Sequence, residues 1–226
     1  MALIINAKGT MSGKEGAIVY SHNRFGTYTR RLVIPTNPAS VKQGIIRSAL
    51  QALSNMWTNC LDANKRAAWD SYAAAVPVTN RLNQSIHLTG LNMYVRTGVP
   101  AIQIGFPSAY PVAPAVMNIG SLLTPTVDTF VAGPPSTIKV TPNVLDDWYL
   151  SANGSMLVYA SRPQGKTVNF FKGPYRLCSP KVTGGTPTQV VTLPFPCVAG
   201  QRIFFQARGL CADGRLSAAV QFQFDT

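Results

Sequence analysis

Few side chains in this 226-residue sequence are of the types that carry out acid–base or metal chemistry. It contains two histidines, His22 and His87, and a single glutamate, Glu15. Neither histidine has a carboxylate or a thiol at a spacing that would make it a general base or part of a metal site. The sequence also lacks the GxSxG and HExxH motifs. These observations predict a protein that is not an enzyme.

The cysteines are the remaining candidates for metal or redox chemistry. They are Cys60, Cys178, Cys197 and Cys211. Their wide spacing, without a CxxC pair, argues against a zinc site. The last three allow at most one disulfide, and buried thiols are favoured for a chain made in a reducing cytoplasm. We therefore predict no metal and no cofactor.

The segment 160–167 ends like a phosphate-binding loop, with Gly165, Lys166 and Thr167 in succession. It has Ala160 where such a loop needs its first glycine, and a predicted strand follows it in place of a helix. Both the backbone cradle and the helix dipole that hold phosphate are therefore lacking, and a hairpin turn is predicted.

Basic residues interleaved with aromatic ones near the N-terminus are the strongest functional signal. The candidate partner-docking residues are Lys14, Arg24, Phe25, Tyr28, Arg30 and Arg31. This composition suits an acidic partner surface, and it could also bind nucleic acid. Further along, Lys42 and Arg47 are five residues apart, about 500° around a helix, so they do not share a face. A continuous groove for a phosphate backbone is not favoured, and we predict docking on protein.

The overall composition points to an assembly subunit. Lys and Arg number 20 against 8 Asp and Glu, a net charge of +12, yet only 12% of residues are charged. The 18 glycines and 17 prolines are too many for a helical bundle, while 46% hydrophobic residues suffice for a core. A surface this poor in charge is often covered by neighbours. No segment is long and apolar enough to span a membrane, and a signal peptide is not expected.

The docking residues fall on a predicted β-hairpin. Residues 17–20 and 28–34 are typical of strands, and the turn-forming residues 21–26 lie between them. Such a hairpin has little core of its own and is marginal unless it packs on something else.

Three helices are predicted after the hairpin. The first has Asn37 as its N-cap and Pro38 at its first position, and it runs to about residue 57. The second runs from the N-cap Asp62 to about residue 75. Thr89 caps the third, which residues 98–100 interrupt. The apolar stripe of the first helix consists of Ile46, Leu50, Leu53 and Trp57.

The second half of the chain is predicted to be an all-β sandwich of the immunoglobulin or fibronectin type III kind. Its expected strands are 137–141, 156–161, 168–171, 189–193, 202–208 and 218–224. The fold class is therefore α+β, in three parts: a basic docking domain of hairpin and helices (1–105), a Pro-rich linker or strap (106–123), and the sandwich (124–226). The first 106 residues hold 11 basic and 3 acidic side chains, or +8 of the total charge.

Several sequence blocks within residues 8–100 agree in order with a known group of proteins. They are Ser12–Arg24, Thr36–Pro38, Gln43, Arg47, Trp57 and Lys65–Ala73. These blocks resemble phage and prophage-encoded proteins that begin with an SGKxGxVxSxNR hairpin, followed by NP…Q…R and W…RxAWxxYA helices. Residues 61–64 depart slightly from that pattern. The resemblance implies a virion component without catalytic residues.

We therefore expect a non-enzymatic bacteriophage virion protein, made in the host bacterial cytoplasm and associated with the capsid as a decoration, cement or minor head protein. Its partners would be the major capsid protein or other virion subunits, in a homo-oligomer or symmetric array. A tail or head–tail connector component is the alternative within the particle. A basic nucleic-acid-binding protein and a carbohydrate-binding module are alternatives from other classes.

Overall fold

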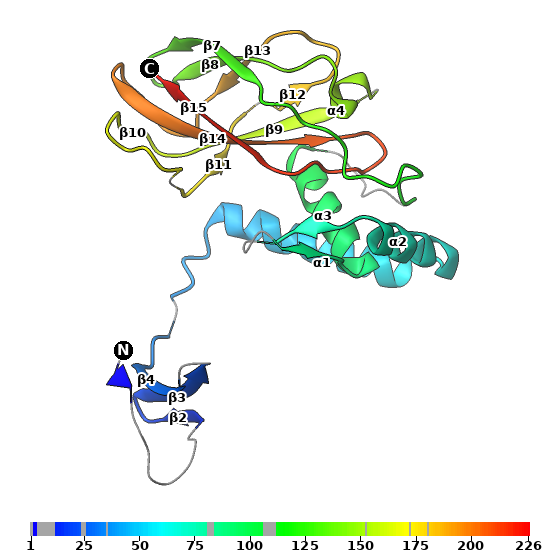
Figure 1. Ribbon diagram of the computed structural model, residues 1–226, viewed down its shortest axis with the longest axis vertical. Helices are drawn as coiled ribbons and strands as arrows, with labels where there is room; N and C mark the ends of the chain where they lie inside the picture. Colours follow the sequence, from blue (N-terminus) through cyan, green and yellow to red (C-terminus); the bar gives the residue numbers. More distant parts are fainter. Residues whose placement is uncertain are drawn as a thin grey trace. The chain divides into compact units, whose positions relative to one another are not determined.

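The computed structural model describes residues 2–3, 12–23, 26–34, 36–80, 84–105, 112–151, 153–171, 173–179 and 181–226. Its internal contacts divide the chain into two compact units, Met1–Val41 (unit 1) and Lys42–Thr226 (unit 2). Unit 1 holds a small β-sheet, and unit 2 combines helices with larger β-sheets (Figure 1). The predicted α+β class, with a predominantly β second half, is confirmed.

Unit 1 contains the predicted hairpin, with strands β3 (Ile18–Asn23) and β4 (Gly26–Arg31). The predicted turn, residues 21–26, is too long. The two strands remain paired within it, since His22 lies opposite Thr27. Two further strands, β1 (Ala2–Leu3) and β2 (Gly13–Glu15), complete an antiparallel sheet in the order β1-β4-β3-β2.

The three predicted helices are α1 (Val41–Asn59), α2 (Ala63–Ala75) and α3 (Gly90–Gln103). The N-cap of α2 is confirmed, since the Asp62 carboxylate accepts a hydrogen bond from the Lys65 backbone N–H at 2.8 Å. The helices share one apolar core. Its buried residues are Leu53, Leu61, Trp69, Tyr72, Ala73, Val76, Met93 and Tyr94.

The predicted start of α1 is wrong, because the helix begins at Val41 rather than at Pro38. The Asn37 side chain accepts a hydrogen bond from the Ala39 backbone N–H at 3.2 Å, which closes a local turn. Ala39 has φ +44°, in the left-handed region, and such a residue cannot continue a right-handed helix. The helix therefore starts only after this turn.

The predicted interruption of α3 is also wrong, because the helix continues through Gly98 and Pro100. A Cβ atom on Gly98 would lie 2.6 Å from Cδ2 of Leu53, so the glycine permits α3 to pack closely on α1. Thr97 and Ala101, on either side, are both fully buried. Tertiary packing here outweighs the low helix propensity of glycine and proline.

The described strands of unit 2 form two sheets and a small β-hairpin, which lies between α2 and α3 in the chain. The larger sheet has the order β10-β14-β9-β11, and in addition β12 pairs with β9 and β15 pairs with β14. The smaller sheet has the order β13-β8-β7. The larger sheet consists of β9 (Ser155–Ala160), β10 (Gln164–Gly165), β11 (Arg176–Leu177), β12 (Val182–Thr183), β14 (Gln201–Leu210) and β15 (Val220–Asp225). The smaller consists of β7 (Thr126–Val131), β8 (Thr137–Thr141) and β13 (Gln189–Thr192). The hairpin pairs β5 (Val78–Thr79) with β6 (Ser85–Ile86).

One apolar core joins the two larger sheets, as a β-sandwich requires. It includes Ile138 from β8, Val191 from β13, Val158 from β9 and Phe205 from β14, all buried. Trp148 completes this core from the short helix α4 (Asp147–Leu150). The immunoglobulin or fibronectin type III subtype stays a prediction, as does the division of the chain into residues 1–105, 106–123 and 124–226.

Five of the six predicted sandwich strands are present. The expected strand 168–171 is wrong: this segment forms no strand, and its Phe171 packs its ring against Phe204 at 5.3 Å between centroids. Strand β7 was not predicted, because its apolar residues Val127, Phe130 and Val131 do not alternate regularly with polar ones. The segment 160–167 does form a reversal, in which the short β10 pairs with β14.

Replacing Gly98 with valine is expected to destabilise the protein by about 1–3 kcal/mol, because the new side chain overpacks Leu53 between α1 and α3. The matched control is Gly44→Val in α1, where nothing lies within 4 Å of the added Cβ. That control should change the unfolding free energy by less than about 0.5 kcal/mol. Urea unfolding followed by circular dichroism measures both variants, and equal effects would contradict a close contact of the two helices.

Candidate docking surfaces

The described part of the unit 1 sheet contains no buried residue. Of the residues in 12–22 and 27–34, none is buried; each is half-buried or exposed. Apolar residues are no exception, since Ile18 is exposed and Val19 is half-buried. A sheet needs a second layer to cover one of its faces, and the described part of unit 1 provides none. For these residues, the prediction that the hairpin has little core of its own is confirmed.

The strand register sorts the candidate docking residues into two faces. Residues directly opposite each other across a ladder share a face, and consecutive residues alternate. Lys14 lies opposite Val19, which lies opposite Arg30, so these three form one row. Tyr28 is two residues before Arg30 and shares its face. Lys14, Tyr28 and Arg30 are therefore brought together.

Arg31 lies on the other face of the same sheet. It is opposite Ile18, which is itself opposite Glu15, so the single glutamate of the chain belongs to the row of Arg31. The remaining two candidates, Arg24 and Phe25, lie outside the described residues. The face of Lys14, Tyr28 and Arg30, which we call the basic face, carries no acidic residue among the described strands.

An apolar segment that follows β4 was missed as a candidate surface. Leu32 extends the hairpin, since its backbone N–H donates to the Ala17 carbonyl at 2.7 Å. The next two side chains, Val33 and Ile34, are 74% and 81% exposed. The sequence does contain a signal for this surface, namely the apolar run that follows Arg30 and Arg31. That run predicts a strand, and a binding surface was not predicted from it.

Unit 2 has an exposed apolar surface at the start of α1. The predicted stripe is only half correct: Leu53 is buried and Trp57 half-buried, but Ile46 and Leu50 are exposed. Together with Ile45, Ile46 lines a groove of about 710 Å³. The other apolar residues of the groove are Ile104 after α3, Tyr159 on β9, and Tyr175 and Leu177 near β11.

The groove combines this apolar lining with positive charge. Lys42, Arg176 and Lys181 line it, and no carboxylate does so among the described residues. The buried hydroxyl of Tyr175 has no hydrogen-bond partner in the part of the chain that the structure describes. Burial raises the pKa of the Cys178 thiol to about 12, so this lining residue stays protonated and unreactive.

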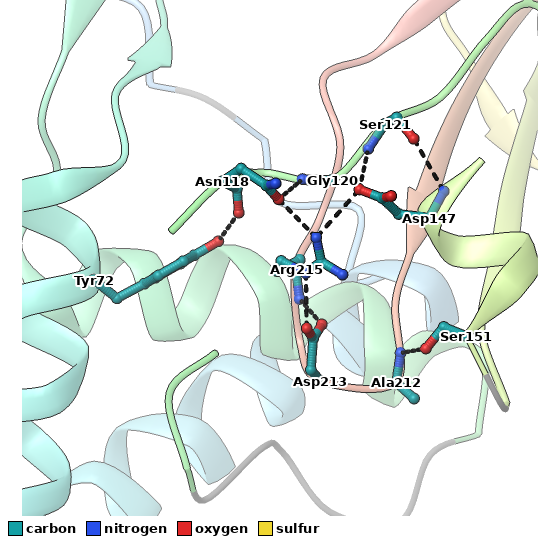
Figure 2. Close-up of polar contacts among 9 residues, drawn as sticks. All are labelled: Tyr72, Asn118, Gly120, Ser121, Asp147, Ser151, Ala212, Asp213 and Arg215. Atoms are coloured by element: carbon teal, nitrogen blue, oxygen red, sulfur yellow. Dashed lines mark hydrogen bonds and ion pairs between the residues drawn. The ribbon is translucent and has the colours of Figure 1, made fainter. Parts of the chain in front are cut away.

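A cluster centred on Arg215 joins the helices to the sandwich (Figure 2). Its guanidinium donates to Asp213 at 2.7 Å, to the Asn118 side chain at 2.7 Å and to Asp147 at 3.2 Å. The backbone carbonyl of Asn118 accepts a hydrogen bond from the Tyr72 hydroxyl of α2 at 2.7 Å. Burial raises the pKa of Tyr72 to about 12, so this donor keeps its proton.

Ser121 ties the same segment to α4. Its backbone N–H donates to the Asp147 carboxylate at 3.1 Å, and its hydroxyl accepts from the Asp147 N–H at 3.0 Å (Figure 2). Residues 118–121 therefore bridge α2 and the sandwich by polar contacts. They fall within the predicted strap, but no spacing in the sequence pairs Arg215 with Asn118, which lies 97 positions away.

The four cysteines are thiols, with Cys60 exposed and the other three buried; Cys60 therefore contradicts the expectation of burial. Among the described residues, no three His, Cys, Asp or Glu side chains lie close enough together to hold a metal ion. None of the described helices has the length and hydropathy of a membrane span.

Comparisons with known proteins give little further information. No protein-family model matches the chain. No curated protein sequence matches it. Among solved structures, the archaellum periplasmic stator protein FlaG from Sulfolobus acidocaldarius is similar, with 17% identity over 45% of this chain and 98% of that one, at a TM-score of 0.23. A TM-score this low carries no argument about fold or function.

Replacing Tyr72 with phenylalanine is expected to cost about 0.5–1.5 kcal/mol of unfolding free energy, because it removes the donor to Asn118. Tyr149→Phe is the matched control, since the described structure shows no hydrogen bond of its hydroxyl, and it should change stability by less than about 0.5 kcal/mol. Chemical denaturation compares the two. If Tyr72→Phe proves as neutral as the control, the bridge at residue 118 does not stabilise unit 2.

Proposed function

We propose that this chain is a non-enzymatic structural subunit of a bacteriophage particle, which docks on neighbouring subunits through its N-terminal sheet. The observation that carries the proposal is the absence of any buried side chain among the described residues 12–22 and 27–34 of that sheet. A folded sheet without a core gains stability when a partner covers it. The resemblance over residues 8–100 supplies the phage context.

The basic face suits contact with another protein. Arg30 and Lys14 flank the apolar Val19, and Tyr28 adds an aromatic ring to the same face. Arginine and tyrosine are enriched among the residues that dominate binding energy in protein interfaces. Unit 1 contains five basic residues against one acidic, so a partner surface with acidic groups around an apolar centre would complement it.

The edges of the sheet offer a second means of attachment. Among the described strands, β1 and β2 are the outermost in the order β1-β4-β3-β2, and each pairs with one neighbour. An edge strand presents unpaired backbone N–H and C=O groups, to which an extended segment of another chain can add. Such main-chain pairing would make attachment tolerant of sequence.

Unit 2 supports the same class of function. The groove at the start of α1 joins exposed Ile45 and Ile46 to the cations Lys42 and Arg176. An apolar surface with a basic rim fits a neighbouring subunit with apolar and acidic side chains. We favour a capsid-associated role, as a decoration, cement or minor head protein on the major capsid protein. A tail or connector position is the alternative outcome when the chain is located in the particle.

The double substitution Lys14→Ala and Arg30→Ala should reduce incorporation into particles by at least about tenfold, because both charges leave the basic face at once. The fold should remain, since exposed charges usually contribute less than about 0.5 kcal/mol. Complementing a phage that lacks this gene, followed by immunoblotting of purified particles, measures incorporation. Circular dichroism checks the fold.

Arg31→Ala is the matched control, because it removes a neighbouring arginine from the opposite face. It should be incorporated at nearly the wild-type level. Normal incorporation of the double variant would show that the basic face is merely solvated. Tight, salt-resistant binding of the purified protein to DNA would instead favour a nucleic-acid-binding protein.

A further inference from the structure

Unit 2 contains a polar cavity with two arginines, separate from the surfaces described above. Its volume is about 410 Å³, and it lies between α3, the end of the β5 strand, and β14. Arg96 comes from α3 and Arg208 from β14, while Thr79 adds a hydroxyl. Val78, Ile119 and Ala219 supply apolar walls.

Arg96 is held in place by the backbone. Its Nη1 donates to the Leu216 carbonyl at 3.0 Å and its Nη2 to the Ser217 carbonyl at 3.4 Å. A guanidinium has five N–H donors, so these two hydrogen bonds leave others for a ligand. Burial, together with the nearby charge of Arg208, lowers the pKa of Arg96 to about 10. Arg96 is therefore a positioned and partly desolvated cation.

Arg208 lies on the side of β14 that faces away from the sandwich core. Ile203, Phe205 and Ala207 alternate into that core, so Arg208 belongs to the opposite face, paired with Leu157 of β9. The part of the chain that the structure describes offers its guanidinium neither a hydrogen bond nor an ion pair. Arg208 is half-buried rather than freely solvated.

The cavity thus has two positive charges and, among its described lining residues, no carboxylate. Two cations that face each other in a partly dry cavity repel more strongly than in water. An anion between them would convert this repulsion into two attractions. Arginine forks match the geometry of phosphate oxygens, with which they form paired, charge-assisted hydrogen bonds.

We propose that this cavity binds an oxyanion of the phosphate class, held by Arg96 and Arg208, with the Thr79 hydroxyl as a further donor. The site is a binding site and involves no covalent step. It is independent of docking by unit 1, so either proposal can fail without the other. The phosphate can come from a free ion or from a phosphomonoester, and the two sources are distinguished by separate probes.

The test uses thermal unfolding of the full chain in sodium phosphate, against sodium chloride of equal ionic strength. At a tenfold excess of phosphate over its dissociation constant, the wild-type Tm should rise by about 3–6 °C. Arg208→Gln should lose this rise and, in chloride, should unfold at the wild-type Tm or above it, because the repulsion of Arg96 is removed. Adenosine monophosphate replaces phosphate in a parallel series, and a larger rise there identifies a phosphomonoester as the ligand.

Lys139→Gln is the matched control, since it removes one positive charge from an exposed position on β8. It should keep the full response to phosphate. Arg208→Lys keeps the charge but not the fork, and should bind phosphate about tenfold more weakly than the wild type. An equal rise in the wild type and Arg208→Gln would show general salt stabilisation and would overturn the proposal, as would failure of phosphate to bind the wild type in equilibrium dialysis.

Discussion

A β-sheet is stable in water when another layer covers at least one of its faces, and this constraint connects the structure to the proposed role. The sandwich of unit 2 meets it, because Ile138 and Phe205 are buried between two sheets. In the sheet of unit 1, none of the described residues 12–22 and 27–34 is buried, and Ile18 and Val19 remain exposed or half-buried. Covering that sheet by a neighbouring subunit would supply the missing layer. In the proposed role, the same surface would serve both folding and attachment.

The described part of unit 2 differs, because it contains three buried apolar clusters and the polar contacts that link them. Arg215 donates from Nε to Asp213 and from Nη1 to Asp147 and Asn118, so two carboxylates compensate its charge. Arg96 binds backbone carbonyls, and Arg208 has neither kind of partner within the described chain. An arginine whose charge is balanced by carboxylates, such as Arg215, makes a structural contact. Arginines without a carboxylate partner among the described residues, such as Arg96 and Arg208, form a candidate ligand site.

Local sequence patterns predicted those helices and strands whose structure is determined mainly by residues close together in the chain. The cap of α2 at Asp62 and the strand 137–141 follow from caps and alternation. Predictions failed where tertiary contacts determine the local structure. The helix α3 continues through Gly98, for example, because this glycine packs on Leu53. Among the candidate docking residues, composition does not separate Arg30 from Arg31, and only the strand register shows that Arg31 lies on the face opposite to Lys14 and Arg30. Long-range pairs such as Arg215 with Asn118 leave no local signal.

Backbone hydrogen exchange of β3 and β4, in the free protein and in purified particles, tests the central claim most directly. A sheet without a core should open easily, so in the free protein its amides should exchange well before those of β9 and β14. In the particle, a covering subunit should slow their exchange by at least about a hundredfold. Protection in the free protein equal to that of β14, and unchanged in the particle, would contradict the claim that this sheet needs a partner.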